Sequence, residues 1–327
     1  MKEFISKIVY SILTGQDYRT YVLATINKRF IDKAQELISE VFEYKRKGDN
    51  WLEKLLVDTY KKIGKENKFK LLWFGGLNEK TVKNMTGGKS TKEVCLDLGE
   101  KNIKALQLLL EEFESSENLY RIKIIIKKDN VQIELDNVES LFFVNIISAM
   151  KLTIQGGAWS EVGKKTEKGL LFVIFRLLKI PDDNYILTTE EMKKKGLVKN
   201  REIDAIVFNK DKEVLTVELK LLGIGNPEIG DEALARKVSL FLVDKLTDMM
   251  KKESEKIGVK VIEFRQDGQE NPLLEIYKFF ESKNVYCSPP EQMTPKELED
   301  KINGIITEWR EEQEDLTFIK KLKEWTK

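Results

Sequence analysis

REIDAIVFNKDKEVLTVELK, residues 201–220, consists of two apolar runs separated by a polar segment. Every second residue of each run is apolar: Ile203, Ala205 and Val207 in the first, and Leu215, Val217 and Leu219 in the second. A period of two residues predicts a β-hairpin, with its turn at residues 209–212. Two acids and a lysine interrupt the apolar pattern, namely Asp204, Glu218 and Lys220.

Strand geometry predicts that these three charged side chains converge. Glu218 and Lys220 are two residues apart and therefore point to the same face. A tight turn centred near residues 210–211 places Asp204 opposite residue 217 and diagonal to Glu218. A register shift of one residue, or a bulge, would bring the two carboxylates side by side.

The chemistry of such a cluster has two interpretations on the residues alone. Two half-buried carboxylates are costly without a cation, and Mg²⁺ typically takes one or two carboxylates while keeping several waters. A metal held there would polarise a phosphoryl oxygen and activate water, so the cluster suits phosphodiester hydrolysis. Alternatively, the cluster is an exposed ion pair on an edge hairpin, worth about 0–1 kcal/mol.

Composition excludes several other classes of chemistry. The 327 residues include no histidine and only two cysteines, which excludes Ser-His-Asp triads, Cys-His dyads, four-ligand zinc sites and a disulfide framework. Catalysis must therefore use Asp, Glu, Lys, Tyr or Ser. The net charge of +1, from 56 basic and 55 acidic residues, does not itself indicate a nucleic-acid partner.

The pattern along the chain predicts a mixed α/β fold with two regions. Residues 1–150 are predicted to be mostly helical, with a strand at 70–76, a loop at 77–100 and a hairpin that turns near residues 128–130. Residues 151–327 are predicted to form a mixed β-sheet flanked by helices. The boundary is expected at Gly156-Gly157, with Ser160 capping the next helix. Further elements are expected as a strand at 184–187, a helix at 231–250, strands at 258–264 and 284–288, a helix at 271–282, and a last helix that begins with a capping box of Thr294 and Glu297.

Ile203-Asp204 and Glu218-Leu219-Lys220 resemble the PD-(D/E)xK motif of type II restriction endonucleases. The order of elements over about residues 151–290 also resembles the core of that family, although Ile203 replaces the motif's proline. The resemblance implies Mg²⁺-dependent cleavage of double-stranded DNA, with one or two metal ions per site. It implies that Asp204 and Glu218 are metal ligands and that Lys220 lies near the attacking water.

The family often has another acid on the helix before the hairpin, here Glu161 or Glu167, and the resemblance implies that this acid is a further catalytic residue and metal ligand. Glu167 is favoured because helical spacing aligns it with inward-facing Leu171, Ile174 and Leu178, while Glu161 suits the helix N-terminus. An ion pair with a lysine is the alternative role for Glu167. Candidate DNA contacts, each of which could equally be a solvated residue, are Lys164, Lys165, Arg201, Asn226, Arg236 and Lys237.

Other motifs are rejected. TGGKST, residues 86–91, lacks the first glycine of a phosphate-binding loop, so ATP is not expected. No apolar run approaches the roughly 20 residues of a membrane helix, and the N-terminus lacks a signal-peptide cleavage pattern, so a cytoplasmic protein of prokaryotic type is expected.

The sequence thus predicts a type II restriction endonuclease working as a homodimer on a short palindrome. The alternatives are a structure-selective repair or junction-resolving nuclease and a non-catalytic DNA-binding protein with the same fold.

Overall fold

The computed structural model shows a chain that divides into two compact units. Unit 1 comprises residues 1–25 and 160–327, and unit 2 comprises residues 26–159. The structure describes residues 2–48, 50–62, 65–88, 90–114, 121–188, 203–221, 238–246, 248–265 and 271–309. Because the second unit is inserted between two pieces of the first, the expected division at residues 150 and 151 does not coincide with these units.

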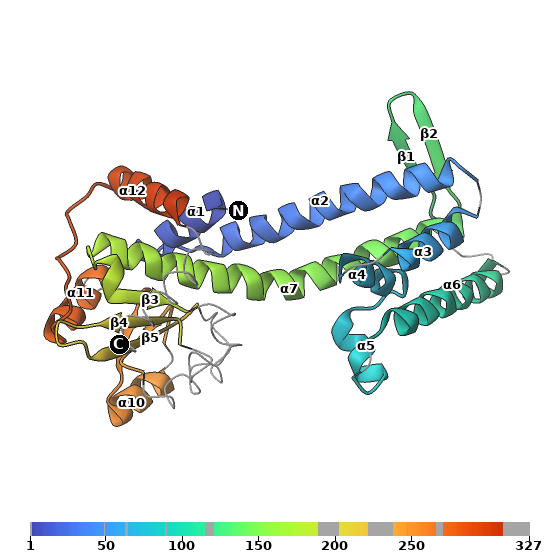
Figure 1. Ribbon diagram of the computed structural model, residues 1–327. Coiled ribbons are helices and arrows are strands. Elements are labelled where there is room, and N and C mark those ends of the chain that lie inside the picture. The colour runs from blue at the N-terminus through green and yellow to red at the C-terminus, as the bar shows by residue number, and fades with distance from the viewer. Residues whose placement is uncertain are drawn as a thin grey trace. The chain divides into compact units, whose positions relative to one another are not determined.

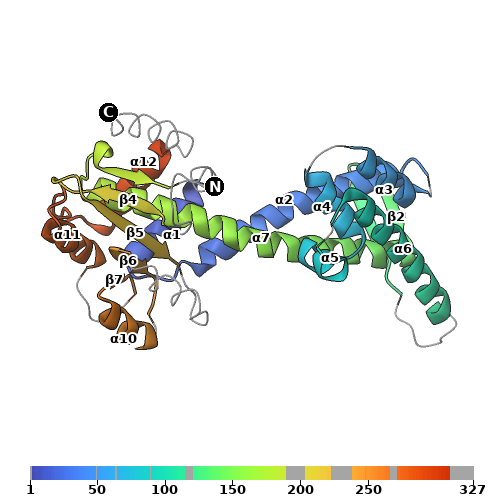
Figure 2. The same cartoon turned by 60° about the horizontal axis from the view of Figure 1, so that its bottom comes forward.

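Unit 1 contains a five-stranded mixed sheet with the order β3-β4-β5-β6-β7 (Figure 2). Its strands are β3 (Tyr185–Leu187), β4 (Ala205–Phe208), β5 (Val214–Lys220), β6 (Leu240–Val243) and β7 (Lys260–Glu263). Pairing is antiparallel from β3 to β5 and parallel from β5 to β7. Among the described residues, helices at least partly in unit 1 are α1 (Lys2–Leu13), the start of α2 (Arg19–Lys45), α7 (Asn137–Leu177), α10 (Asp248–Ile257), α11 (Pro272–Ser282) and α12 (Pro295–Glu308), with a 3₁₀ turn η1 (Asp182–Asn184). The predicted mixed sheet flanked by helices, preceded by a helical region, is confirmed.

Helix α7 corrects the expected boundary, because it continues through Gly156 and Ser160 without interruption. The helix end at Gly156 and the cap at Ser160 were therefore wrong predictions. A glycine inside a helix costs only about 1 kcal/mol relative to alanine. Burial of Phe142 and Ile146 before the glycine, and of Leu170 and Ile174 after it, outweighs that cost.

Strand β6 is the second correction, since the sequence predicted one helix over residues 231–250. Within that range the structure describes residues 238–246 and 248–250, where β6 precedes the start of α10. All four residues of β6 are buried, as expected for a strand with parallel partners on both sides and both faces covered. The expected strand at 284–288 is reduced to an isolated bridge between Asn209 and Val285.

The two ends of the described chain meet in unit 1. The ammonium group of Lys2 donates hydrogen bonds to the carbonyls of Thr307 and Trp309, at 2.9 and 2.8 Å, at the C-terminal end of α12. Gly169 of α7 permits this packing, because a Cβ there would lie 3.1 Å from Ile5 Cγ2 and 3.4 Å from Ile306 Cδ1. The N-terminal helix is therefore an integral part of the unit that carries the sheet.

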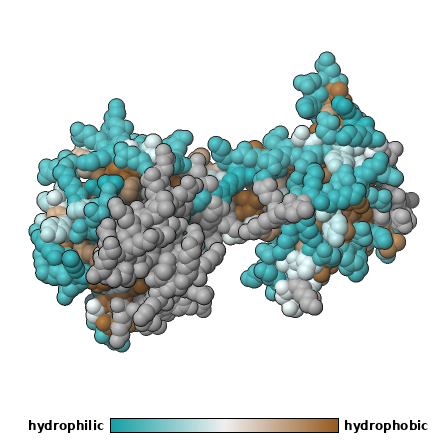
Figure 3. All heavy atoms as spheres, in the orientation of Figure 1, coloured by the Kyte–Doolittle hydropathy of each residue, from teal (hydrophilic) through white to brown (hydrophobic). Residues whose placement is uncertain are grey.

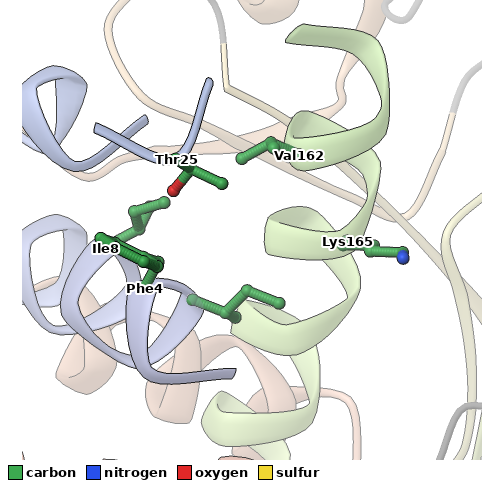
Figure 4. A pocket seen from close by; sticks show the side chains of 6 residues that line it. Phe4, Ile8, Thr25, Val162 and Lys165 are labelled. Carbon is green, nitrogen blue, oxygen red and sulfur yellow. The ribbon is translucent and has the colours of Figure 1, made fainter. Parts of the chain in front are cut away.

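A narrow crevice lies between α1, residue Thr25 and α7 (Figure 4). It is lined by Phe4, Ile5, Ile8, Thr25, Val162 and Lys165. The figure shows the Lys165 side chain extending away from the crevice, which leaves the lining almost entirely apolar. None of the lining residues is an acid, and the hydroxyl of Thr25 donates a hydrogen bond to the carbonyl of Tyr21 at 2.8 Å.

In the residues that the structure describes, unit 2 is helical apart from one hairpin (Figure 1). Helices wholly or partly in this unit are α2 (Arg19–Lys45), α3 (Trp51–Lys61), α4 (Lys65–Phe74), α5 (Glu79–Met85), α6 (Lys92–Glu114) and the first part of α7. The strand predicted at 70–76 is thus wrong, as is most of the loop predicted at 77–100. Leu71, Leu72 and Phe74 are buried against the other helices, so tertiary packing decides the state of this apolar run.

The segment Asn137–Gly156 is long and apolar enough, by length and composition alone, to cross a membrane. This corrects the expectation from sequence that no apolar run approaches the length of a membrane helix. In the structure this segment supplies Phe142, Ile146 and Met150 to the buried core of unit 2. Part of this segment is therefore packed into the core of unit 2, and a third of it is buried.

The hairpin predicted near residues 128–130 is confirmed as β1 (Ile124–Lys128) and β2 (Val131–Leu135). Likewise confirmed are the capping box of Thr294 and Glu297 at the start of α12 and the strand β3. These elements are set by short-range signals in the sequence.

Glu291, in the connection before α12, provides a pH-dependent contribution to stability. Hydrogen bonds from Lys179 and Lys301, each 2.7 Å long, lower its pKa from 4.5 to about 2. Because the folded-state pKa is depressed, the contribution is complete above about pH 4.5 and is lost as the pH falls through 2. We expect Glu291→Gln to flatten the fall in melting temperature over this pH range, measured by calorimetry against the unmodified chain. Parallel curves for the two proteins would contradict this.

Candidate active site

The turn between β4 and β5 fixes how the acidic residues face each other. The side chain of Asn209 accepts hydrogen bonds from the amides of Asp211 and Glu213, at 3.0 and 2.8 Å. Lys212 has a positive φ of 62°, which lets the chain reverse with β4 and β5 in the register Ala205↔Val217. Continuing this register by one residue places Asp204 opposite Glu218. The diagonal arrangement predicted from sequence is therefore corrected by one position.

Asp204 forms hydrogen bonds with the backbone of the two residues on either side of Glu218. Its amide donates to the carbonyl of Val217 at 3.0 Å, and its carboxylate Oδ2 accepts from the amide of Leu219 at 2.9 Å. Asp204 is 6% exposed and Glu218 is completely buried. Because β5 is flanked by β4 and β6, Glu218 lies inside the sheet, so the interpretation of an exposed edge hairpin does not fit the structure.

Lys220 and Glu167 complete the group at the C-terminal end of β5. The Lys220 ammonium lies 3.7 Å from Glu218 Oε1, and the lysine side chain is only 15% exposed. Glu167, on α7, accepts a hydrogen bond from the amide of Leu221 at 3.2 Å through Oε1. Glu167 thus reaches the residue that follows Lys220, whereas the side chain of Glu161 lies outside the described part of the structure.

Sequence reasoning missed a second charged group at the adjacent strand ends. Asp244, directly after β6, is completely buried and receives two hydrogen bonds from the guanidinium of Arg265, that from Nε being 2.5 Å long. The Tyr18 hydroxyl donates to Asp244 Oδ2 at 3.2 Å. Burial, followed by the charge and hydrogen bond of Asp244, raises the pKa of Tyr18 well above its usual value, so the hydroxyl keeps its proton.

This second group is connected to the first through the backbone. The amide of Asp244 donates to the carbonyl of Lys220 at 3.3 Å, and the amide of Arg265 donates to the carbonyl of Asp244 at 3.0 Å. Tyr18 lies between α1 and α2, 226 residues from Asp244 in the sequence. Its hydrogen bond to Asp244 therefore connects this segment to the strand ends beside Lys220. The signal available in the sequence was the acid that directly follows the apolar run of residues 240–243.

The donor set fits a hard cation. Asp204 and Glu218 are buried carboxylates on neighbouring strands, and Mg²⁺ commonly takes one or two such groups and completes its shell with water. Among the described residues no three Asp, Glu, Cys or His side chains converge into a preformed metal cage. A two-carboxylate site with Glu167 nearby is thus the arrangement that these residues support.

The predicted DNA contacts have different outcomes. Lys164 is exposed and Lys165 is partly exposed on α7, on the helix that carries Glu167. Arg201, Asn226, Arg236 and Lys237 lie outside the described residues. Arg236 and Lys237 were expected on a helix over residues 231–250, and β6 contradicts that helix.

Comparison with known families identifies the family of this chain. A family model described as CfrBI restriction endonuclease matches residues 2–251, a range that contains Glu167, Asp204, Glu218 and Lys220. The chain belongs to the CfrBI restriction endonuclease family. It is therefore a type II restriction endonuclease, a nuclease that acts on DNA. No curated protein and no solved structure matches the chain.

Proposed function

We propose that the protein hydrolyses phosphodiester bonds of double-stranded DNA at a short specific sequence and requires Mg²⁺. The observation that carries this proposal is the pairing of buried Asp204 with buried Glu218, with the Lys220 ammonium 3.7 Å from Glu218. Burying charged carboxylates costs several kcal/mol for each ion, and a divalent cation would offset this cost. The absence of histidine leaves this cluster as the group best suited to hydrolysis.

In this proposal Asp204 and Glu218 would hold Mg²⁺, which would supply Lewis-acid polarisation of the scissile phosphate and a more acidic bound water. Lys220 orients the attacking water and balances negative charge as the water oxygen bonds to phosphorus and the bond to the leaving sugar oxygen breaks. Glu167 reaches the backbone at Leu221 and holds the end of β5 in place. The Asp204–Leu219 hydrogen bond orients the Asp204 carboxylate toward the same strand end.

The test is digestion of unmethylated phage DNA by the full chain, with Mg²⁺ and with an excess of chelator. Discrete fragments that require Mg²⁺ are expected, and sequencing their ends would give the recognition sequence. A continuous smear, or cleavage restricted to branched DNA, would instead support a structure-selective nuclease. Intact DNA at several temperatures and with Mn²⁺ as well would support a non-catalytic DNA-binding protein and refute the proposal.

We further propose that the active form is a homodimer, because a two-fold symmetric site is read most simply by a symmetric pair of subunits. Light scattering of the full chain, alone and with a duplex carrying the recognition sequence, measures the mass directly. A monomer bound to one duplex would refute the dimer and leave the proposed chemistry unaffected.

A further inference from the structure

The β1–β2 hairpin forms a two-stranded sheet of its own in unit 2. Figure 1 shows it extending away from the helices of that unit. Ile133 and Leu135 are buried at its inner face, whereas every residue from Lys127 to Gln132 is exposed. In Figure 3 the projecting hairpin is largely hydrophilic, with scattered apolar side chains. The outer half of the hairpin thus forms a polar ribbon in solvent.

Hydrogen bonds hold this ribbon at its base and at its tip. At the base, buried Ser140 accepts from the amide of Ile124 at 3.0 Å and donates to the carbonyl of Leu135 at 3.1 Å. At the tip, Lys128 pairs with Val131 across a two-residue turn in which Asp129 has a φ of 53°. A short ribbon fixed at both ends loses little conformational entropy on binding a partner.

The whole hairpin, together with the residues just before it, carries more positive charge than the average of the chain predicts. Residues 121–135 contain four basic residues and two acids, a net charge of +2, while the whole chain has a net charge of +1. The basic residues are Arg121, Lys123, Lys127 and Lys128. One of the acids, Glu134, forms an ion pair with Lys123, which leaves Lys127 and Lys128 as the cations nearest the tip. This distribution is complementary to a polyanion.

The uncharged groups on the outer face match the edges of bases. Gln132 lies directly across from Lys127, and its Nε2 donates to Glu134 Oε1 at 3.1 Å, which keeps the amide along the outer face. Glutamine pairs with adenine in the major groove, lysine with guanine, and apolar groups contact the thymine methyl. Ile125, on the same face, is 47% exposed and supplies an apolar group.

We propose that the β1–β2 hairpin inserts into the major groove of duplex DNA and supplies part of the sequence readout of this endonuclease. A major groove about 12 Å wide admits a two-stranded β-ribbon. Lys127 and Lys128 contact phosphates at the groove wall, and Gln132 faces the base edges. The inference rests on the proposed function, since a ribbon that reads bases is of use to an enzyme that cuts at a specific sequence.

The first test measures binding of the full chain to a 30-bp random-sequence duplex by fluorescence anisotropy, with chelator present so that DNA stays intact. We expect Lys127→Gln combined with Lys128→Gln to weaken binding at least tenfold at low salt. We also expect the slope of log K against log salt to decrease by about two. The matched control, Lys80→Gln combined with Lys104→Gln, removes two exposed lysines from α5 and α6 of the same unit and should bind like the unmodified chain.

The second test compares the phage-DNA fragments produced by Gln132→Ala with those of the unmodified chain. Additional cut sites that differ from the original sequence at one position are expected. If the lysine variant binds as tightly as its control and the fragments are unchanged, the inference is overturned while the proposed function stands. If the unmodified chain neither binds nor cuts DNA, the proposed function itself fails. A hairpin variant that loses its oligomeric state would show that the ribbon is a subunit contact and also overturn the inference.

Discussion

Glu218→Gln is expected to slow DNA cleavage by roughly 10³-fold, equivalent to about 4 kcal/mol in the activation free energy. The substitution keeps the size of a side chain that is completely buried in β5, but it removes the negative charge opposite Asp204. A neutral amide is a poor ligand for Mg²⁺ beside a lysine whose ammonium lies 3.7 Å from the replaced oxygen. The measurement is the single-turnover cleavage rate at saturating Mg²⁺ and enzyme.

The matched control is Asp183→Asn, which makes the same change of charge at an exposed carboxylate in the 3₁₀ turn before β3. It should leave the cleavage rate within about twofold of the unmodified value. Thermal melting of both variants separates loss of catalysis from loss of folding. A Glu218→Gln protein that melts normally and cuts within tenfold of the unmodified rate would remove Glu218 from the reaction.

Asp244→Ala is expected to lower the free energy of unfolding of unit 1 by about 3–5 kcal/mol. Asp244 is completely buried and is the shared acceptor of the Arg265 guanidinium and the Tyr18 hydroxyl. Removing the carboxylate leaves the Arg265 guanidinium and the Tyr18 hydroxyl without this acceptor. Water cannot easily replace it, because Tyr18 is only 5% exposed. The measurement is denaturant unfolding followed by circular dichroism, compared at equal protein concentration.

Glu3→Ala serves as the control, since Glu3 pairs with Lys7 at 3.3 Å on the surface of α1 with 76% of its own side chain exposed. Such an exposed pair contributes about 0–0.5 kcal/mol. Asp244→Asn retains hydrogen-bond acceptor capacity without the charge. It should lower the free energy of unfolding by less than Asp244→Ala and by more than Glu3→Ala. If Asp244→Ala is no more destabilising than Glu3→Ala, the buried network does not stabilise the strand ends.

The parts of the fold that sequence predicted are those fixed by short-range chemistry. The β4–β5 hairpin follows from a two-residue period and an asparagine-containing turn, which is why Asp204 and Glu218 could be paired within one position. Glu167 was placed by helical spacing from Leu171 and Ile174, and it does reach the end of β5. The capping box at Thr294 is equally local.

The parts that sequence missed depend on burial by distant segments. Val238, Leu242 and Leu246 repeat every four residues and therefore fit a helix, although the chain forms β6 because both of its faces are covered. The contact between Tyr18 and Asp244 joins residues 226 positions apart and leaves no periodic signature. Gly156 is tolerated inside α7 because packing on either side of it exceeds the local cost.

The contact between Lys2 and the carbonyls of Thr307 and Trp309 also determines when the enzyme can mature during synthesis. At about 5–20 residues per second, the ribosome needs roughly 15–60 s between the residues that α1 and α12 contribute. The strands with Asp204 and Glu218 are made before α12 is available to pack against α1, so unit 1 cannot complete its fold until synthesis has passed residue 309. A nuclease assembled in this way makes both of its active-site acids before the pair of helices that completes their unit.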